Sequence, residues 1–258
     1  MSDFESILND ALYDQYLIDR RYEKEMEIAT LNQCIYLFVE GLTEEKTYPE
    51  LLAKCDIDLV ELGIIVANYN GIGNLIPSLR LLHKTLSSKR PVVITFDNDE
   101  EGIKHQNKIQ NLGLNPELIT LMPIPSIVKP IQYPSGHYGG SFEELFPSEH
   151  FIEQVFCRDF MPAVIVSEKA QFVMEFQKNK SWLKQAAKFC ADRDDSGLSD
   201  LKIKIGVRLA ETCRHIPPDI QKLASSLREV RGKYPIRHFS DIAEAIAERE
   251  IKEDNREG

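Results

Sequence analysis

Four short, largely apolar runs alternate with amphipathic segments in the first half of the sequence. This alternation limits the fold more than any other feature. The runs occupy residues 35–39, 62–67, 92–96 and 117–122. Runs of this kind are typical of strands buried on both faces, and parallel strands need a crossover, which is usually a helix. The pattern therefore predicts an α/β fold with a Rossmann-like, mostly parallel sheet of four strands covered by helices.

The chain divides into three parts. A helical extension is predicted over residues 1–33, because a capping-box pattern precedes apolar residues at helical period. We expect this helix either to pack on the main domain or to bind a partner. The α/β domain covers residues 34–147 and includes a loop over 123–140 that is rich in proline, glycine and tyrosine. Residues 148–258 are expected to be mostly helical, with a charged, solvated tail from residue 244.

Composition narrows the cellular setting and the classes of ligand. The 258 residues are 43% hydrophobic, enough for a well-buried core, with no apolar run long enough to span a bilayer and no secretory signal. The five cysteines are scattered without CxxC spacing, which favours free thiols over a zinc site or a disulfide framework. We therefore expect a cytoplasmic protein that does not enter a membrane. Since the net charge of −10 repels nucleic acid, such a ligand would require metal ions, a local basic patch or a basic partner.

Acidic residues follow two of the predicted strands where each strand ends. Glu40 follows the first strand, and Asp97 and Asp99 follow the third; Glu44 lies at the start of the helix after the first strand. The carboxyl ends of parallel strands meet at one edge of the sheet, where ligands bind in such folds. Carboxylates gathered there repel each other unless a cation neutralises them, and Mg²⁺ prefers carboxylate oxygens. The sequence therefore predicts a divalent-metal site, although each acid alone also suits a helix cap or a solvated first turn.

The residues around these acids resemble the TOPRIM domain of topoisomerases, primases and OLD-family (overcoming-lysogenization-defect) nucleases. The segment VEGLTE over residues 39–44 and the segment DNDEEG over residues 97–102 are similar to its two hallmark motifs. The resemblance implies that Glu40, Asp97 and Asp99 bind Mg²⁺ or Mn²⁺ and support nucleotidyl transfer or strand cleavage.

Three further positions are similar to the OLD branch of that superfamily. Glu44 matches a second acid at the start of the helix. Glu143 matches a downstream acidic motif, with its neighbour Glu144 as the alternative. Lys202 matches a catalytic lysine that would stabilise charge in the transition state, with Lys204 as the alternative. The same residue type and position also fit a solvated lysine on the surface of a helix, and we weigh this interpretation of Lys202 equally with the catalytic one.

The resemblance implies a site with two metal ions. Asp97, Asp99 and Glu40 would hold one ion. Glu44, with Glu143, would help to hold the second. Such a pair can activate a water and neutralise the leaving oxygen of a phosphoryl transfer, and Glu40 is also a candidate general base.

The sequence also lacks a G-x-x-x-x-G-K-[ST] phosphate loop, so we do not expect ATP hydrolysis. OLD proteins usually carry an ABC-type ATPase ahead of the TOPRIM part. The chain therefore resembles stand-alone TOPRIM proteins of two-gene anti-phage defence systems, in which the ATPase is a separate chain. The resemblance implies an endonuclease effector acting on DNA or RNA, including tRNA. Its expected partners are that nucleic acid, the ABC-type ATPase and, as an option, a second copy of the chain.

Local basic residues would have to contact the substrate, although most single surface lysines and arginines only aid solubility. The candidates are Lys89, Arg90, Lys129, Arg228, Arg231, Lys233 and Arg237, with His137 and Tyr138 in the glycine-rich loop.

Two alternatives stay open. An Asp-x-Asp strand end is also the nucleophile motif of haloacid-dehalogenase phosphatases. Those enzymes usually place Thr or Val where this chain has Glu101, and they leave Glu40 unexplained. A non-catalytic TOPRIM scaffold is the second alternative; loss of the acids would mark it, and they are all present.

Overall fold

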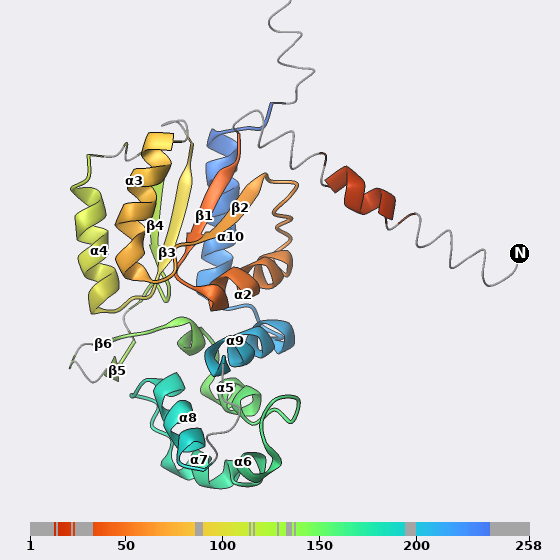
Figure 1. Cartoon of the computed structure of the whole chain (residues 1–258), viewed down its shortest axis with the longest axis vertical. Helices are drawn as coiled ribbons and strands as arrows, with labels where there is room; N and C mark the ends of the chain where they lie inside the picture. Colours follow the sequence, from red (N-terminus) through yellow and green to blue (C-terminus); the bar gives the residue numbers. More distant parts are fainter. Residues whose placement is uncertain are drawn as a thin grey trace, which may run out of the picture.

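A computed structural model describes residues 13, 15–21, 23, 33–85, 90–113, 115, 117–127, 129–132, 136, 138–193 and 200–237. Its centre is a parallel sheet of β1 (Ile35–Val39), β2 (Ile64–Asn68), β3 (Val92–Phe96) and β4 (Ile119–Pro123). The strand order is β2-β1-β3-β4, and all three pairings are parallel (Figure 1). The prediction of a four-stranded parallel sheet is confirmed.

Helices cover both faces of this sheet. Leu37 and Val39 of β1 join a core with α2 (Leu42–Ala53) and α10 (Pro218–Lys233). Phe38 of β1 and Ile94 of β3 face the other way, toward α3 (Leu75–Thr85) and α4 (Glu100–Gln110). Because successive strand residues point to opposite faces, one apolar strand supplies both cores. A short 3₁₀ turn, η1 (Ile72–Asn74), follows β2.

Below the sheet in Figure 1 lies a helical region. Its elements are η2 (Phe142–Leu145), α5 (Ser148–Val155), α6 (Ala163–Ser167), α7 (Lys169–Glu175), α8 (Trp182–Ala191) and α9 (Leu201–Thr212). Aromatic rings fill its interior; Phe172 lies 5.1 Å from Phe189 and 5.3 Å from Phe156, centroid to centroid. This interior is continuous with the α2–α10 side of the sheet. The expected helical character after residue 147 is confirmed for the described part.

A small hairpin connects the two regions. Strands β5 (Ile131–Gln132) and β6 (Tyr138–Gly139) are antiparallel and belong to the predicted loop. The hairpin therefore gives part of that loop a defined structure.

The ends of the chain are described only in part. Tyr13, residues 15–21 and Glu23 are helical, in line with the expected N-terminal helix, whereas the other residues before Gln33 lie outside the described ones. The predicted charged tail also lies outside them. Among the described helices none is long and apolar enough to cross a membrane.

Candidate active site

Two adjacent strands bring their terminal acids together. Glu40 directly follows β1, Asp97 directly follows β3, and β1 pairs with β3. The Glu40 carboxylate accepts a hydrogen bond of 3.2 Å from the backbone N–H of Asp97. The parallel topology therefore places these two residues side by side, as the sequence predicted.

Two acids and a lysine from other elements join this edge. Glu44 is on the first turn of α2, Glu143 is in η2, and Lys202 is on the first turn of α9. Both glutamates are buried, and the Lys202 ammonium lies 4.0 Å from Glu44 Oε1. Glu44 Oε2 and Glu143 Oε1 are buried with no hydrogen-bond partner. These two oxygens are free to accept a cation.

The acids interact strongly enough to shift their protonation. Burial raises the pKa of Asp97 well above its usual range, and the carboxylate of Glu40 adds to the effect. Burial likewise raises the pKa values of Glu40 and Glu44. Burial alone would lower the pKa of Lys202, but nearby carboxylates, Glu143 first, outweigh it and raise that pKa. The cluster thus holds one ammonium and retains an excess of acidic groups that added positive charge would stabilise.

The donor set fits a hard divalent cation, because it consists of carboxylate oxygens and two of them are buried and unpaired. In the ranges that the structure describes, however, no group of three or more His, Cys, Asp or Glu residues has the geometry of a metal site. Asp99 Oδ1 caps α4 by accepting a 2.8 Å hydrogen bond from the Gly102 N–H. The cap reading of Asp99 is therefore confirmed for one oxygen, and metal binding by these acids stays a prediction.

The two members of each alternative pair differ in their contacts. Both oxygens of Glu144 are used, because they accept hydrogen bonds from the backbone N–H groups of Ser141 (2.6 Å) and Trp182 (3.2 Å). Glu144 thereby fixes η2 and the start of α8, and Glu143 is the acid with an unpaired oxygen. Lys202, on the turn of α9 next to Glu44, is the lysine that contacts the acids.

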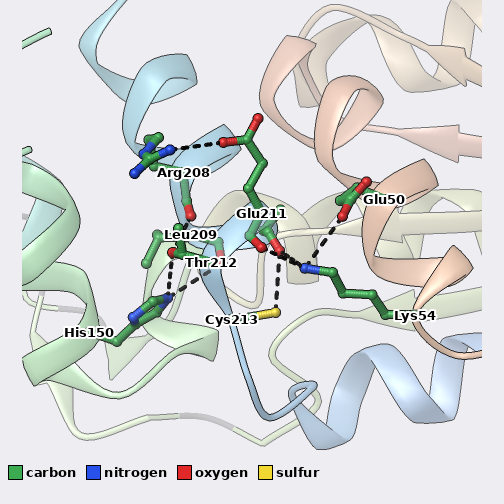
Figure 2. A network of polar contacts seen from close by, with 9 residues as sticks. Glu50, Lys54, His150, Arg208, Leu209, Glu211, Thr212 and Cys213 are labelled. Carbon is green, nitrogen blue, oxygen red and sulfur yellow. Dashed lines mark hydrogen bonds and ion pairs between the residues drawn. The ribbon is translucent and has the colours of Figure 1, made fainter. Parts of the chain in front are cut away.

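Gly206 and Lys54 position α9 against α2. A Cβ on Gly206 would come closer than 3.0 Å to Thr43 Cγ2, so only glycine allows this approach. At the other end of the contact, Lys54 donates to the carbonyl oxygen of Ala210 at 2.6 Å. It also donates to the carbonyl oxygen of Glu211 at 2.8 Å (Figure 2). The lysine caps the C-terminus of α9, where carbonyls lack helical partners. A glycine inside a helical pattern was the sequence signal for this packing.

The loop after β4 is hydrogen-bonded to Asn98, the residue between Asp97 and Asp99. Asn98 and Gly140 exchange two backbone hydrogen bonds of 3.2 Å, and the Asn98 side chain donates to the Pro125 carbonyl at 2.9 Å. A Cβ on Gly139 would collide with the Asn98 backbone. The loop therefore lies beside the candidate site. Tyr138 is 55% exposed, and His137 lies outside the described residues.

Several of the arginines proposed to bind substrate also make hydrogen bonds within the fold. Arg231 is buried and donates to the backbone carbonyls of Leu62, Gly63, Gln33 and Tyr234. Arg228 donates to the Cys55 carbonyl, and Arg90 donates to the Tyr36 hydroxyl. The expectation of substrate contact is wrong for Arg231, because its guanidinium is consumed within the fold. Lys89 lies outside the described residues.

This parallel sheet, with acids at the ends of β1 and β3, defines a TOPRIM-type α/β domain. Residues 35–99 match the family model described as overcoming lysogenization defect protein-like, TOPRIM domain. The chain therefore contains a TOPRIM domain that resembles that of OLD proteins. The match includes Glu40, Glu44, Asp97 and Asp99 and supports a nuclease-type function with nucleic acid as the ligand.

Solved structures similar to the chain include C-terminal regions of two OLD proteins. That from Xanthomonas campestris pv. campestris is 16% identical with a TM-score of 0.46, covering 76% of this chain and 94% of the other. That from Burkholderia pseudomallei is 16% identical with a TM-score of 0.44, covering 76% of this chain and 96% of the other. No curated protein matches the chain significantly.

Proposed function

We propose that the chain is a metal-dependent endonuclease that hydrolyses phosphodiester bonds in DNA or RNA. The observation that carries the proposal is the convergence of Glu40, Asp97, Glu44 and Glu143 on Lys202, from four separate elements of the chain. Mutual repulsion and burial make such a cluster unfavourable for folding alone, and groups of this kind concentrate at functional sites.

The residues divide into ligands and charge-stabilising groups. Glu40, Asp97 and Asp99 would hold one divalent ion, and Glu44 with Glu143 would hold another, Mg²⁺ or Mn²⁺ in both cases. Bound there, the ions would lower the pKa of a water and polarise the phosphoryl oxygens. The unpaired oxygens of Glu44 and Glu143 are available for this without breaking any hydrogen bond.

The protein side chains would handle charge and protons. The Lys202 ammonium is placed to stabilise the negative charge that develops on the phosphoryl oxygens. Glu40 has a raised pKa, so its carboxylate is a suitable acceptor for the proton released by the attacking water. In the balanced reaction, water adds one oxygen to phosphorus, the bond to the leaving oxygen breaks, and that oxygen takes up a proton.

The biological setting that we propose is an anti-phage effector in the cytoplasm with a separate ABC-type ATPase as partner. Its support is the resemblance of the segments over residues 39–44 and 97–102 to those of stand-alone TOPRIM proteins. Co-expression with a candidate ABC-type ATPase, followed by affinity purification, tests this part; a chain that purifies without the ATPase refutes the stable complex.

The activity is tested with the purified chain and a panel of duplex DNA, single-stranded DNA, tRNA and other RNA. We expect cleavage with Mg²⁺ or Mn²⁺, none with EDTA, and a loss of at least about 100-fold in Asp97→Asn and Glu40→Gln. Glu229→Gln is the matched control, because Glu229 is an exposed glutamate of α10 that pairs only with surface lysine Lys233 in the described salt bridges. Cleavage by Asp97→Asn at the wild-type rate would refute the site. Trapped aspartyl-phosphate on Asp97 would favour the phosphatase alternative, and metal-independent binding without cleavage would favour the scaffold.

A further inference from the structure

A groove with a basic wall lies in the helical region, outside the acid cluster. It has a volume of about 770 Å³ and lies between β5, the end of α7, and α8. Its charged lining consists of Lys180, Lys184, Lys188 and Arg193 against Glu175 and Asp192. The lining therefore carries net positive charge in a chain whose net charge is −10. A local basic patch of this kind is what a polyanionic ligand would need.

The lysines are arranged as a row. Lys184 and Lys188 are exposed and stand four residues apart on α8, and Lys180 precedes the helix on the same groove. The Cβ atoms of residues at this spacing lie about 5–6 Å apart on one helix face, so both lysines can face the same ligand. Arg193 is held differently: it lies 3.4 Å from the Phe189 ring centroid and pairs with Glu168, so it shapes the groove wall. The other positively charged residues of the groove lining are Lys180, Lys184 and Lys188.

The β5–β6 hairpin links this groove to the acid cluster. At one end, Gln132 lines the groove and its N–H donates to the Asn179 carbonyl at 2.7 Å. At the other end, Gly140 pairs with Asn98 between the two strand-end aspartates. Figure 1 shows the hairpin between the sheet and α8. Tyr138 on this hairpin is 55% exposed.

We propose that the groove binds the nucleic-acid substrate as a single strand that leaves the acid cluster across the β5–β6 hairpin. The inference rests on the nuclease function proposed above. The lysine row would neutralise consecutive phosphates, and Tyr138 would stack on a base between the groove and the site. A single strand fits better than a duplex, because an exposed ring can stack only on a base that is not already stacked within a helix.

Binding is measured with the full chain in EDTA, so that affinity is separated from cleavage. The probes are fluorescent 20-nucleotide oligothymidylate and oligouridylate and a 20-base-pair duplex. At 0.1 M salt, Lys184→Gln with Lys188→Gln should weaken binding of the single strands roughly 10- to 30-fold and reduce the salt slope by about 1.4. The matched control is Lys104→Gln with Lys108→Gln, an exposed pair with the same four-residue spacing on α4.

Tyr138 is tested separately with the same probes. Tyr138→Ala should weaken binding of single strands about fivefold or more, whereas Tyr138→Phe should retain it, because the stacking surface is kept. Equal affinity of the alanine and wild-type chains would overturn the stacking role.

The outcomes separate this inference from the nuclease proposal. The groove inference is refuted if the α4 and α8 lysine variants weaken binding of the single strands equally. It is also refuted if the duplex binds more tightly than either single strand. If cleavage needs Asp97 but the α8 double variant binds with unchanged affinity, the groove is not the binding site. The nuclease proposal is then still supported. If binding depends on Lys184 and Lys188 but the chain cleaves none of the nucleic acids, the groove is supported as a binding site and the nuclease proposal is refuted.

Discussion

The close approach of α9 to α2 makes Gly206→Ala a direct test of how the lysine is positioned. A Cβ at residue 206 would lie under 3.0 Å from Thr43 Cγ2, and Thr43 is buried on the face of α2 next to Glu44. Carbon atoms in contact prefer about 3.5–4.0 Å. The two helices must therefore separate by at least about 0.5 Å, and Lys202, one turn earlier on α9, moves with them.

The expected change in the free energy of unfolding follows from two opposing effects. Overpacking costs about 1–3 kcal/mol, and replacing a helical glycine by alanine returns about 1 kcal/mol. The net free energy of unfolding should therefore fall by about 0–2 kcal/mol, which leaves the chain folded. Catalytic groups must be held within about 0.5 Å of their working geometry, so the cleavage rate should fall at least about tenfold.

Urea unfolding and the cleavage rate are measured for two comparison variants. Gly232→Ala in α10 has open space around the new Cβ, so it reports the helix-propensity gain alone and should stabilise the chain without changing the rate. Thr43→Ser removes the methyl group that the new Cβ would strike, so combining it with Gly206→Ala should recover both stability and rate. If Gly206→Ala stabilises the chain as much as Gly232→Ala and cleaves at the wild-type rate, the close approach does not position Lys202.

Three other predictions follow from the described contacts. Lys202→Met should lower the cleavage rate about 100-fold or more while Lys204→Met changes it less than about twofold, measured in single-turnover assays; equal effects would contradict the contact with the acids. Arg231→Met should lower the free energy of unfolding by about 3 kcal/mol or more, because four carbonyls lose a charged donor, whereas Lys233→Met should leave the urea midpoint unchanged. Burial alone would raise the pKa of Asp219, but hydrogen bonds from a loop serine and a helix lysine outweigh it and lower that pKa. Its stabilising effect is thus full above the unfolded value of about 3.9 and lost as the pH falls through the lower folded value. Asp219→Asn should therefore destabilise the chain by about 1 kcal/mol at pH 7, and the difference in urea midpoint should vanish in strong acid; a constant difference would refute the assignment.

The sequence alone determined the sheet and the first half of the site. Runs that are largely apolar report burial on both faces, and that signal is local, so the strands near residues 35–39 and 92–96 were predictable. Parallel topology then forces the residues after those strands to one edge, which brought Glu40 and Asp97 together. No coordinates were needed for this step.

The resemblance to a known family suggested further site residues that hydrophobic periodicity could not indicate. Glu143 and Lys202 lie about 100 and 160 residues beyond Glu40 in the sequence, in segments whose local pattern only indicates helix. Short motifs suggested both residues, and the structure adds that hydrogen bonds occupy both carboxylate oxygens of the neighbouring Glu144.

Only the tertiary structure decided how the distant segments meet. The return of α10 to the sheet buries Arg231, which by composition alone looked like a substrate contact. The packing of α9 on α2 depends on a missing side chain at Gly206 and on a lysine that caps a remote helix end. Local periodicity records which face of a segment is buried, but not the surface that buries it, because that choice is made by shape and charge across long sequence separations.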